Sequence, residues 1–219
     1  MITAQPRRYH IHIDGTTFPE VLAREARRIG FYETNFSGHP EGFQHFEPKV
    51  HLTLKAEGVE SFNAAWSELE KVASAVEWKG YIEGEFIPFD DELPWKEYVD
   101  VPVPFKLERR RLRSEEDFRQ TEVHVVMDKD ASDARLMRGL LEAGLYGAYL
   151  PKQDHTALVL TAQGYKADIF RLSGVLRKYL ASVGGAARCT LKEERAIRYK
   201  LFNLLPEELP EIVDCVQYF

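Results

Sequence analysis

Alternating apolar and polar residues predict a strand near the start of the chain. In the segment YHIHID, residues 9–14, every second residue is apolar. Its polar face carries His10, His12 and Asp14. A helix is predicted directly afterwards, because Thr17 and Glu20 have the spacing of a capping box and apolar residues then recur at helical spacing up to Gly30. We therefore expect a half-buried strand followed by an amphipathic helix.

The same succession returns later in the chain. TEVHVVMD alternates in the same way, so that His10 corresponds to His124 and Asp14 to Asp128, a spacing of 114 residues. VHLTLKAEG and HTALVLTAQG also correspond, and each precedes a helical stripe. Agreement in residue order, residue type and turn position is typical of an internal repeat. We therefore predict that the chain is a duplication.

Each half is predicted to run strand, helix, strand, strand, helix, strand. This succession is the βαββαβ pattern of the ferredoxin-like fold. We predict an α+β protein of two such lobes, residues 1–114 with a Pro-rich and charged bridging segment, and residues 115–219 with a C-terminal tail. Because both helices cover one face of each antiparallel sheet, the other faces are expected to face a central cleft. The bridge around residues 101–111 alternates enough to be a strand, and the tail is expected to pack on a lobe or a partner.

Histidines concentrate on the predicted central strands. Five of the seven histidines point away from the helices in this arrangement. They are His10, His12, His51, His124 and His155. Imidazole serves as acid or base at neutral pH, so a site between the lobes is expected. The acidic pair Glu193–Glu194 is instead interpreted as part of a solvated ion-pair network.

The tetrapeptide HLTL, which begins at His51, resembles the H-x-[ST]-hydrophobic motif of the 2H phosphoesterases, the superfamily of RNA-ligase-like and cyclic phosphodiesterase proteins. The resemblance implies a metal-independent phosphodiester hydrolase with no cofactor and a small phosphorylated or nucleotide-like substrate. It implies that His51 and His155 act as acid and base and that Thr53 binds phosphate. The second motif, HTAL, has Ala157 where Ser or Thr is expected. His10, His12 and His124 are expected to line the substrate pocket.

A metal site is the alternative interpretation of the same face. Two histidines on one strand and a third on its neighbour can hold Zn, Fe or Cu. YHIHID together with GHP, residues 38–40, resembles the DOPA dioxygenase-like proteins, which are ferredoxin-like and use strand histidines around iron. This resemblance implies an Fe or Zn site of His10, His12 and His51, with Asp14 as an additional carboxylate. A third alternative is a non-catalytic ligand-binding protein.

Composition limits the partners. A formal net charge of −6 argues against bulk nucleic-acid binding. Two cysteines in 219 residues make neither a disulfide framework nor a zinc pattern. No apolar run approaches the roughly 20 residues of a membrane span, and no secretory signal is evident. We therefore expect a cytoplasmic protein that does not bind membranes. Its oligomeric state does not follow from the sequence.

Overall fold

The computed structural model describes residues 7–38, 50–88, 105–111, 120–131, 134–184, 189–209 and 211–218. The first half contains β1 (Arg8–Thr17), α1 (Glu20–Ile29), β2 (Tyr32–Glu33), β3 (Val50–Glu57), α2 (Val59–Ser74) and β4 (Lys79–Ile87). The second half contains β6 (Gln120–Asp128), α3 (Ala134–Ala143), β7 (Tyr146–Pro151), β8 (Thr156–Tyr165), α4 (Lys166–Ser182) and β9 (Cys189–Phe202). β5 (Phe105–Arg111) and β10 (Glu211–Tyr218) flank the second half, and 3-10 helices lie at Lys129–Ala131 and Pro206–Glu208.

Both halves have the strand order of the ferredoxin-like fold. The first sheet runs β2-β3-β1-β4 and the second runs β7-β8-β6-β9, and neighbouring strands within each are antiparallel. The α+β class and the antiparallel, ferredoxin-like arrangement are therefore confirmed. A shared strand order does not by itself establish a common origin, so the duplication stays a prediction. The predicted boundary at residues 114 and 115 lies outside the described residues.

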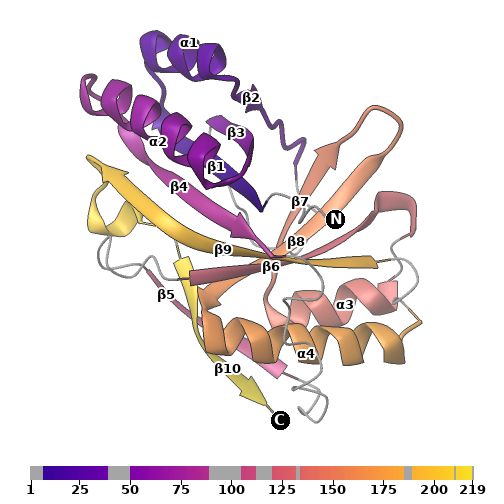
Figure 1. Ribbon diagram of the computed structural model, residues 1–219. Coiled ribbons are helices and arrows are strands. Elements are labelled where there is room, and N and C mark those ends of the chain that lie inside the picture. Colours follow the sequence, from indigo (N-terminus) through magenta and orange to yellow (C-terminus); the bar gives the residue numbers. More distant parts are fainter. Residues whose placement is uncertain are drawn as a thin grey trace, which may run out of the picture.

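The two sheets join at both of their edges. Strand β9 pairs with β6 along its first part and with β4 along its second part, both antiparallel, so the sheets are continuous there (Figure 1). At the other edges, Ser37 N–H donates to the Tyr149 carbonyl at 3.0 Å, and Tyr149 N–H donates to the Gly38 carbonyl at 2.9 Å. These bonds tie the segment after β2 to β7. The strands therefore close into a barrel-like ring with an interior and an exterior.

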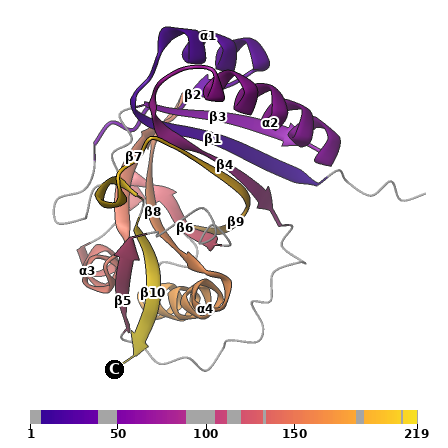
Figure 2. The ribbon, with the colours of Figure 1, turned by 90° about the vertical axis from the view of Figure 1, so that its left-hand side faces the viewer.

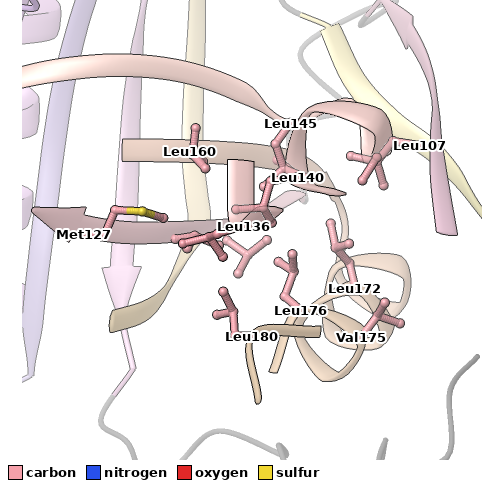
Figure 3. Packing of buried hydrophobic residues seen from close by; sticks show 14 of the residues in the cluster. Leu107, Met127, Leu136, Leu140, Leu145, Leu160, Leu172, Val175, Leu176 and Leu180 are labelled. Atoms are coloured by element: carbon pink, nitrogen blue, oxygen red, sulfur yellow. The ribbon is translucent and has the colours of Figure 1, made fainter. Parts of the chain in front are cut away.

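The helices lie outside this ring. Helices α1 and α2 cover the first sheet, and α3 and α4 cover the second on the opposite side of the molecule (Figure 1; Figure 2). The apolar face of β1, including Ile11 and Ile13, packs into the first core, as the alternation predicts. The second core packs Met127 and Leu160 against leucines of α3 and α4 (Figure 3). Burial of these faces leaves the polar faces of both sheets directed inward.

One prediction fails at the start of α1, and another is confirmed at the bridge between the halves. Strand β1 continues through Thr17, which pairs with Lys79, so α1 begins at Glu20 after Pro19 and no side chain caps it. The capping box is therefore wrong, because sheet pairing takes Thr17 into the strand. The predicted bridge strand is present as β5, which pairs with β10 of the C-terminal tail, and β10 also touches β8 at Gly164. Among the described helices, none is both long and apolar enough to cross a bilayer.

Candidate functional site

Polar side chains from six strands meet inside the ring. They are His10, His12 and Asp14 of β1, His51 and Thr53 of β3, Tyr81, Glu83 and Glu85 of β4, Glu122 and His124 of β6, Thr161 and Gln163 of β8, and Glu194 and Tyr199 of β9. The two halves touch each other here: Gln163 Nε2 donates to Glu83 Oε1 at 3.3 Å, and His10 Nδ1 lies 3.4 Å from Glu194 Oε1. The polar faces are thus in direct contact at these points.

A β-bulge in β9 places two of these side chains on the same face. Along the β4–β9 pairing, Gly84 is opposite Arg198 and Glu85 is opposite Ala196, so Ile197 is the extra residue. An extra residue reverses the alternation of the residues that follow it. The bulge therefore directs Glu194 and Tyr199 into the same interior, although an odd number of positions, five, separates them along the strand.

A chain of hydrogen bonds links the interior side chains of the first half. Asp14 Oδ1 lies 2.5 Å from His51 Nδ1, and His51 Nε2 lies 3.1 Å from the Thr53 hydroxyl. The same hydroxyl lies 3.1 Å from His12 Nδ1, and His12 Nε2 lies 3.0 Å from Glu85 Oε2. The two imidazoles stack with ring centroids 4.9 Å apart. Thr53 is thus placed between two histidines, each of which contacts a carboxyl group.

One arrangement of protons satisfies this whole chain. Glu85 donates its proton to Nε2 of His12, which donates from Nδ1 to the Thr53 hydroxyl. Thr53 in turn donates to Nε2 of His51, and His51 donates from Nδ1 to Asp14. Moving one proton along each of the first three bonds gives a second arrangement, in which Glu85 is ionised and His51 is positively charged. The chain can therefore carry a proton between Glu85 and His51.

Glu194 is the centre of a second group of interior side chains, and this group contains residues from both halves of the chain. Its Oε1 lies 3.4 Å from His10 Nδ1, and its Oε2 lies 3.7 Å from His124 Nε2. His124 Nε2 also lies 3.1 Å from Glu122 Oε2, while its Nδ1 lies 2.8 Å from the Thr161 hydroxyl. Nδ1 of His10 is buried without a hydrogen-bond partner. The two oxygens of one carboxylate therefore face histidines that come from different halves of the chain.

Burial shifts the pKa values of these groups strongly. Burial raises the pKa of Glu85 well above its usual range, and the charges of Glu194 and Glu83 raise it further. Burial lowers the pKa of His12, and the nearby His51 lowers it further. Burial also lowers the pKa of His51, but the charge and hydrogen bond of Asp14 outweigh this effect and raise it. The two stacked histidines thus differ in proton affinity, as an acid and a base require.

The groups around Glu194 are held as an ion cluster. Burial lowers the pKa of His124, but contacts with Glu122 and Glu194 raise it to about 10. Burial raises the pKa of Glu194, but attraction to His10 and His124 brings it well below its usual range. A positive charge is therefore strongly stabilised between these carboxylates.

Three groups of side chains have the donor atoms of a metal site. Among the described residues, His10, His12, Glu85 and Glu194 each place one ligand atom within 4.8 Å of all the others. The same holds for Glu122, His124 and Glu194, and for Glu83, Glu85 and Glu122. Metal bonds of about 2.1 Å hold ligand atoms about 3–4 Å apart, so contraction by about an ångström would suffice. The side chains of the four interior histidines are 12–20% exposed, so water reaches them. These histidines are His10, His12, His51 and His124.

The structure separates His155 from these groups. His155 lies in the turn between β7 and β8, its side chain is 42% exposed, and its Nδ1 contacts Asp154 at 2.7 Å. The position that corresponds to His51 is Ala157, because Asp14 pairs with His51 and Asp128 pairs with Ala157. Among the contacts of the described residues, none joins His155 to His51. The catalytic roles of His51, Thr53 and His155 stay predictions.

Sequence reasoning missed the carboxylates. Glu194 is not part of a solvated network, because its side chain is only 13% exposed and contacts two interior histidines. Glu83 and Glu85 alternate with apolar residues in KGYIEGEFI, a pattern that indicates one acidic and one apolar strand face. That signal was present in the sequence. Glu85 and Glu194 lie beside His10 and His12, whereas His51 contacts Asp14, and the metal set of His10, His12 and His51 stays a prediction.

A surface cavity of about 440 Å³ lies elsewhere, at the start of α2. Arg7 and Arg198 flank it, each beside an aromatic ring, and Tyr9, Phe62 and Phe86 line it. Tyr9 and Phe86 lie on the helix-covered face of the first sheet, and Phe62 belongs to α2, which packs on that face. The cavity is therefore on the opposite side of that sheet from the histidines.

Comparisons with known proteins show no family. No family model matches the chain, and no curated protein matches it. Among solved structures, it is similar to a candidate monooxygenase from Fusobacterium nucleatum subsp. nucleatum, with 12% identity and a TM-score of 0.28, over 91% of this chain and 96% of that chain. It is also similar to aspartate kinase from Synechocystis, with 11% identity and a TM-score of 0.26, over 86% of this chain and 43% of that chain. Structural similarity this low does not support any inference about function.

Proposed function

We propose that this protein is a metal-dependent hydrolase whose centre lies inside the ring. A divalent cation binds His10, His12, Glu85 and Glu194. The observation that carries the proposal is this set of two imidazoles and two carboxylates, whose ligand atoms lie within 4.8 Å of one another. Such a nitrogen and oxygen set suits Fe²⁺, Mn²⁺ or Zn²⁺. Two carboxylates and one divalent cation are also electrically neutral together, which lowers the cost of burying them.

The hydrogen bonds of His12 are those expected of a histidine that binds a metal ion. Metal binding at Nε2 requires that the ring carry its proton on Nδ1, and the Thr53 hydroxyl lies 3.1 Å from Nδ1. Thr53 then donates to His51, which is held by Asp14. A cation held there would supply a bound water of lowered pKa as the nucleophile for hydrolysis of the ester, and a histidine would return a proton to the leaving oxygen. His51, which contacts both Thr53 and Asp14, would be that proton-transfer group.

Charge favours a cation over a free phosphate anion in this interior. Five carboxyl groups face it: Asp14, Glu83, Glu85, Glu122 and Glu194. A phosphodiester without a cation meets this negative charge in a medium of low dielectric constant, where like charges repel strongly. The resemblance of HLTL to the phosphoesterase motif supports a phosphodiester as the first substrate to test, with the cation as its binding partner.

The metal-independent phosphodiesterase is the second candidate. The observation that favours it is the Thr53 hydroxyl between His12 and His51, because two histidines of different pKa beside one hydroxyl form an acid and base pair. In this version His12 takes the role that the resemblance to the 2H phosphoesterases implies for His155. The two candidates differ in their dependence on a cation.

The experiment is metal removal followed by titration. Chelator-treated protein is titrated with Mn²⁺, Co²⁺ or Zn²⁺ by calorimetry, and hydrolysis of bis-p-nitrophenyl phosphate and of a 2′,3′-cyclic nucleotide is measured before and after. We expect binding, hydrolysis only with the cation, and about 10- to 100-fold or greater loss of affinity in Glu85→Gln. His155→Ala is the exposed-histidine control and should bind the cation as the wild type does. Absence of binding overturns the proposal, and full activity of the chelated protein supports the second candidate.

A further inference from the structure

We propose that the interior holds a second divalent cation, bound by Glu122, His124 and Glu194. This inference rests on the proposed function, because Glu194 is also a ligand of the first cation. Glu194 would therefore bridge the two ions. The result is a two-metal centre assembled from both halves of the chain.

The orientation of Glu194 is the main evidence. Its Oε1 faces His10 Nδ1 at 3.4 Å, and its Oε2 faces His124 Nε2 at 3.7 Å. Each oxygen is thus directed at a different imidazole nitrogen, which is the arrangement of a carboxylate that bridges two cations. Ions in two-metal sites are about 3.5–4 Å apart, a span that one carboxylate covers. Nδ1 of His10 is buried without a hydrogen-bond partner, so the first position has an unused ligand atom directed at the bridge.

The imidazoles at the two positions are held in the same way. His12 Nδ1 contacts the Thr53 hydroxyl at 3.1 Å, and His124 Nδ1 contacts the Thr161 hydroxyl at 2.8 Å. In both cases the threonine lies on the strand that pairs beside the histidine. This contact leaves Nε2 of each ring directed at carboxylates, as is usual for a metal-bound histidine. The second position therefore has its own orienting hydrogen bond.

Two cations would balance the charge of the four interior glutamates in their ionised form. Glu83, Glu85, Glu122 and Glu194 together carry four negative charges when ionised, and ligand atoms of the first three lie within 4.8 Å of one another. One divalent cation leaves two of these charges uncompensated, whereas two divalent cations neutralise all four. Asp14 is paired separately with His51. A second cation would lie where His124 Nε2, Glu122 Oε2 and Glu194 Oε2 meet.

The test is the number of cations bound per chain. Chelator-treated protein is titrated with Mn²⁺ by calorimetry, and the loaded protein is examined by electron paramagnetic resonance. We expect two Mn²⁺ per chain and the multi-line spectrum of a spin-coupled pair. In His124→Ala and in Glu122→Gln, we expect one Mn²⁺ per chain and the six-line spectrum of an isolated ion. Asp128→Asn is the matched control, because Asp128 lies exposed on the same face of β6, and it should still bind two.

The outcomes separate this inference from the proposed function. One Mn²⁺ per chain in the wild type, or two in folded Glu122→Gln, overturns the second site and leaves the first intact. No bound Mn²⁺ in the wild type, with the same result for Zn²⁺ and Co²⁺, overturns both. Circular dichroism of each variant shows whether it is folded. Glu122→Gln keeps the shape of the side chain, so it remains informative if His124→Ala does not fold.

Discussion

Replacing Thr53 by valine removes one hydroxyl and keeps the shape of the side chain. That hydroxyl lies 3.1 Å from His12 Nδ1, from His51 Nε2 and from the Thr34 hydroxyl. Thr53 is 4% exposed, so water cannot readily take its place. A buried polar group that loses its partner costs about 1–3 kcal/mol. Three polar groups lose this partner, so we expect the free energy of unfolding to fall by at least about 1–3 kcal/mol.

The same change should weaken metal binding. Without the hydroxyl, His12 loses the acceptor that holds its proton on Nδ1 and its Nε2 free for the cation. Loss of such an outer-shell partner costs about 10- to 100-fold in metal affinity. Urea unfolding measures the stability, and calorimetric titration with Mn²⁺ measures the affinity. Thr53→Ser keeps the hydroxyl and is the control, so its affinity should stay within a few-fold of the wild type.

Two results would refute this reasoning. If Thr53→Val binds Mn²⁺ as tightly as the wild type, the hydroxyl does not orient a ligand. If Thr53→Ser loses as much affinity as Thr53→Val, packing of the Thr53 methyl group, rather than its hydroxyl, is responsible.

The remaining predictions concern the interior charge and the exterior packing. Because burial and neighbouring charges raise the pKa of Glu83 above its unfolded value, metal-free protein should lose stability as the pH rises above about 4.5, with a slope of up to about 1.4 kcal/mol per pH unit. Glu83→Gln should reduce this loss in urea unfolding at pH 5 and pH 8, while Glu85, whose pKa is also raised, keeps its own contribution. Parallel pH profiles of variant and wild type would contradict the prediction. In Gly84→Ala, the new Cβ would lie 2.6 Å from Phe62 Cζ and 3.0 Å from Trp66 Cζ3, so stability should fall by about 1–3 kcal/mol with unchanged Mn²⁺ affinity. If Gly84→Ala is as stable as the wild type, α2 moves without cost to make room for the added methyl group, and the prediction is wrong.

Much of the fold follows from local patterns. The alternation in YHIHID and VHLTLKAEG decides which side chains face the helices, because successive side chains of a strand point to opposite faces. Ile11 and Leu52 are buried under the helices, and His10 and Thr53 lie on the other face, as predicted. The order of strands and helices likewise indicated the ferredoxin-like arrangement of each half. The sequence by itself therefore determined the two sheet faces and the place of most histidines.

The site depended on contacts that no local pattern contains. Glu194 lies between His10 and His124 because β4 pairs with β9 and because β9 contains the extra residue Ile197. More than 180 residues separate Glu194 from His10 along the chain. The alternation of residues also predicted that His155 points inward. In the structure, His155 lies in the hairpin turn and its side chain is exposed to solvent. Only the tertiary structure decided which carboxylates meet which histidines. The physical reason is that side-chain direction is set by neighbouring residues, while strand pairing and bulges are set by packing between distant segments.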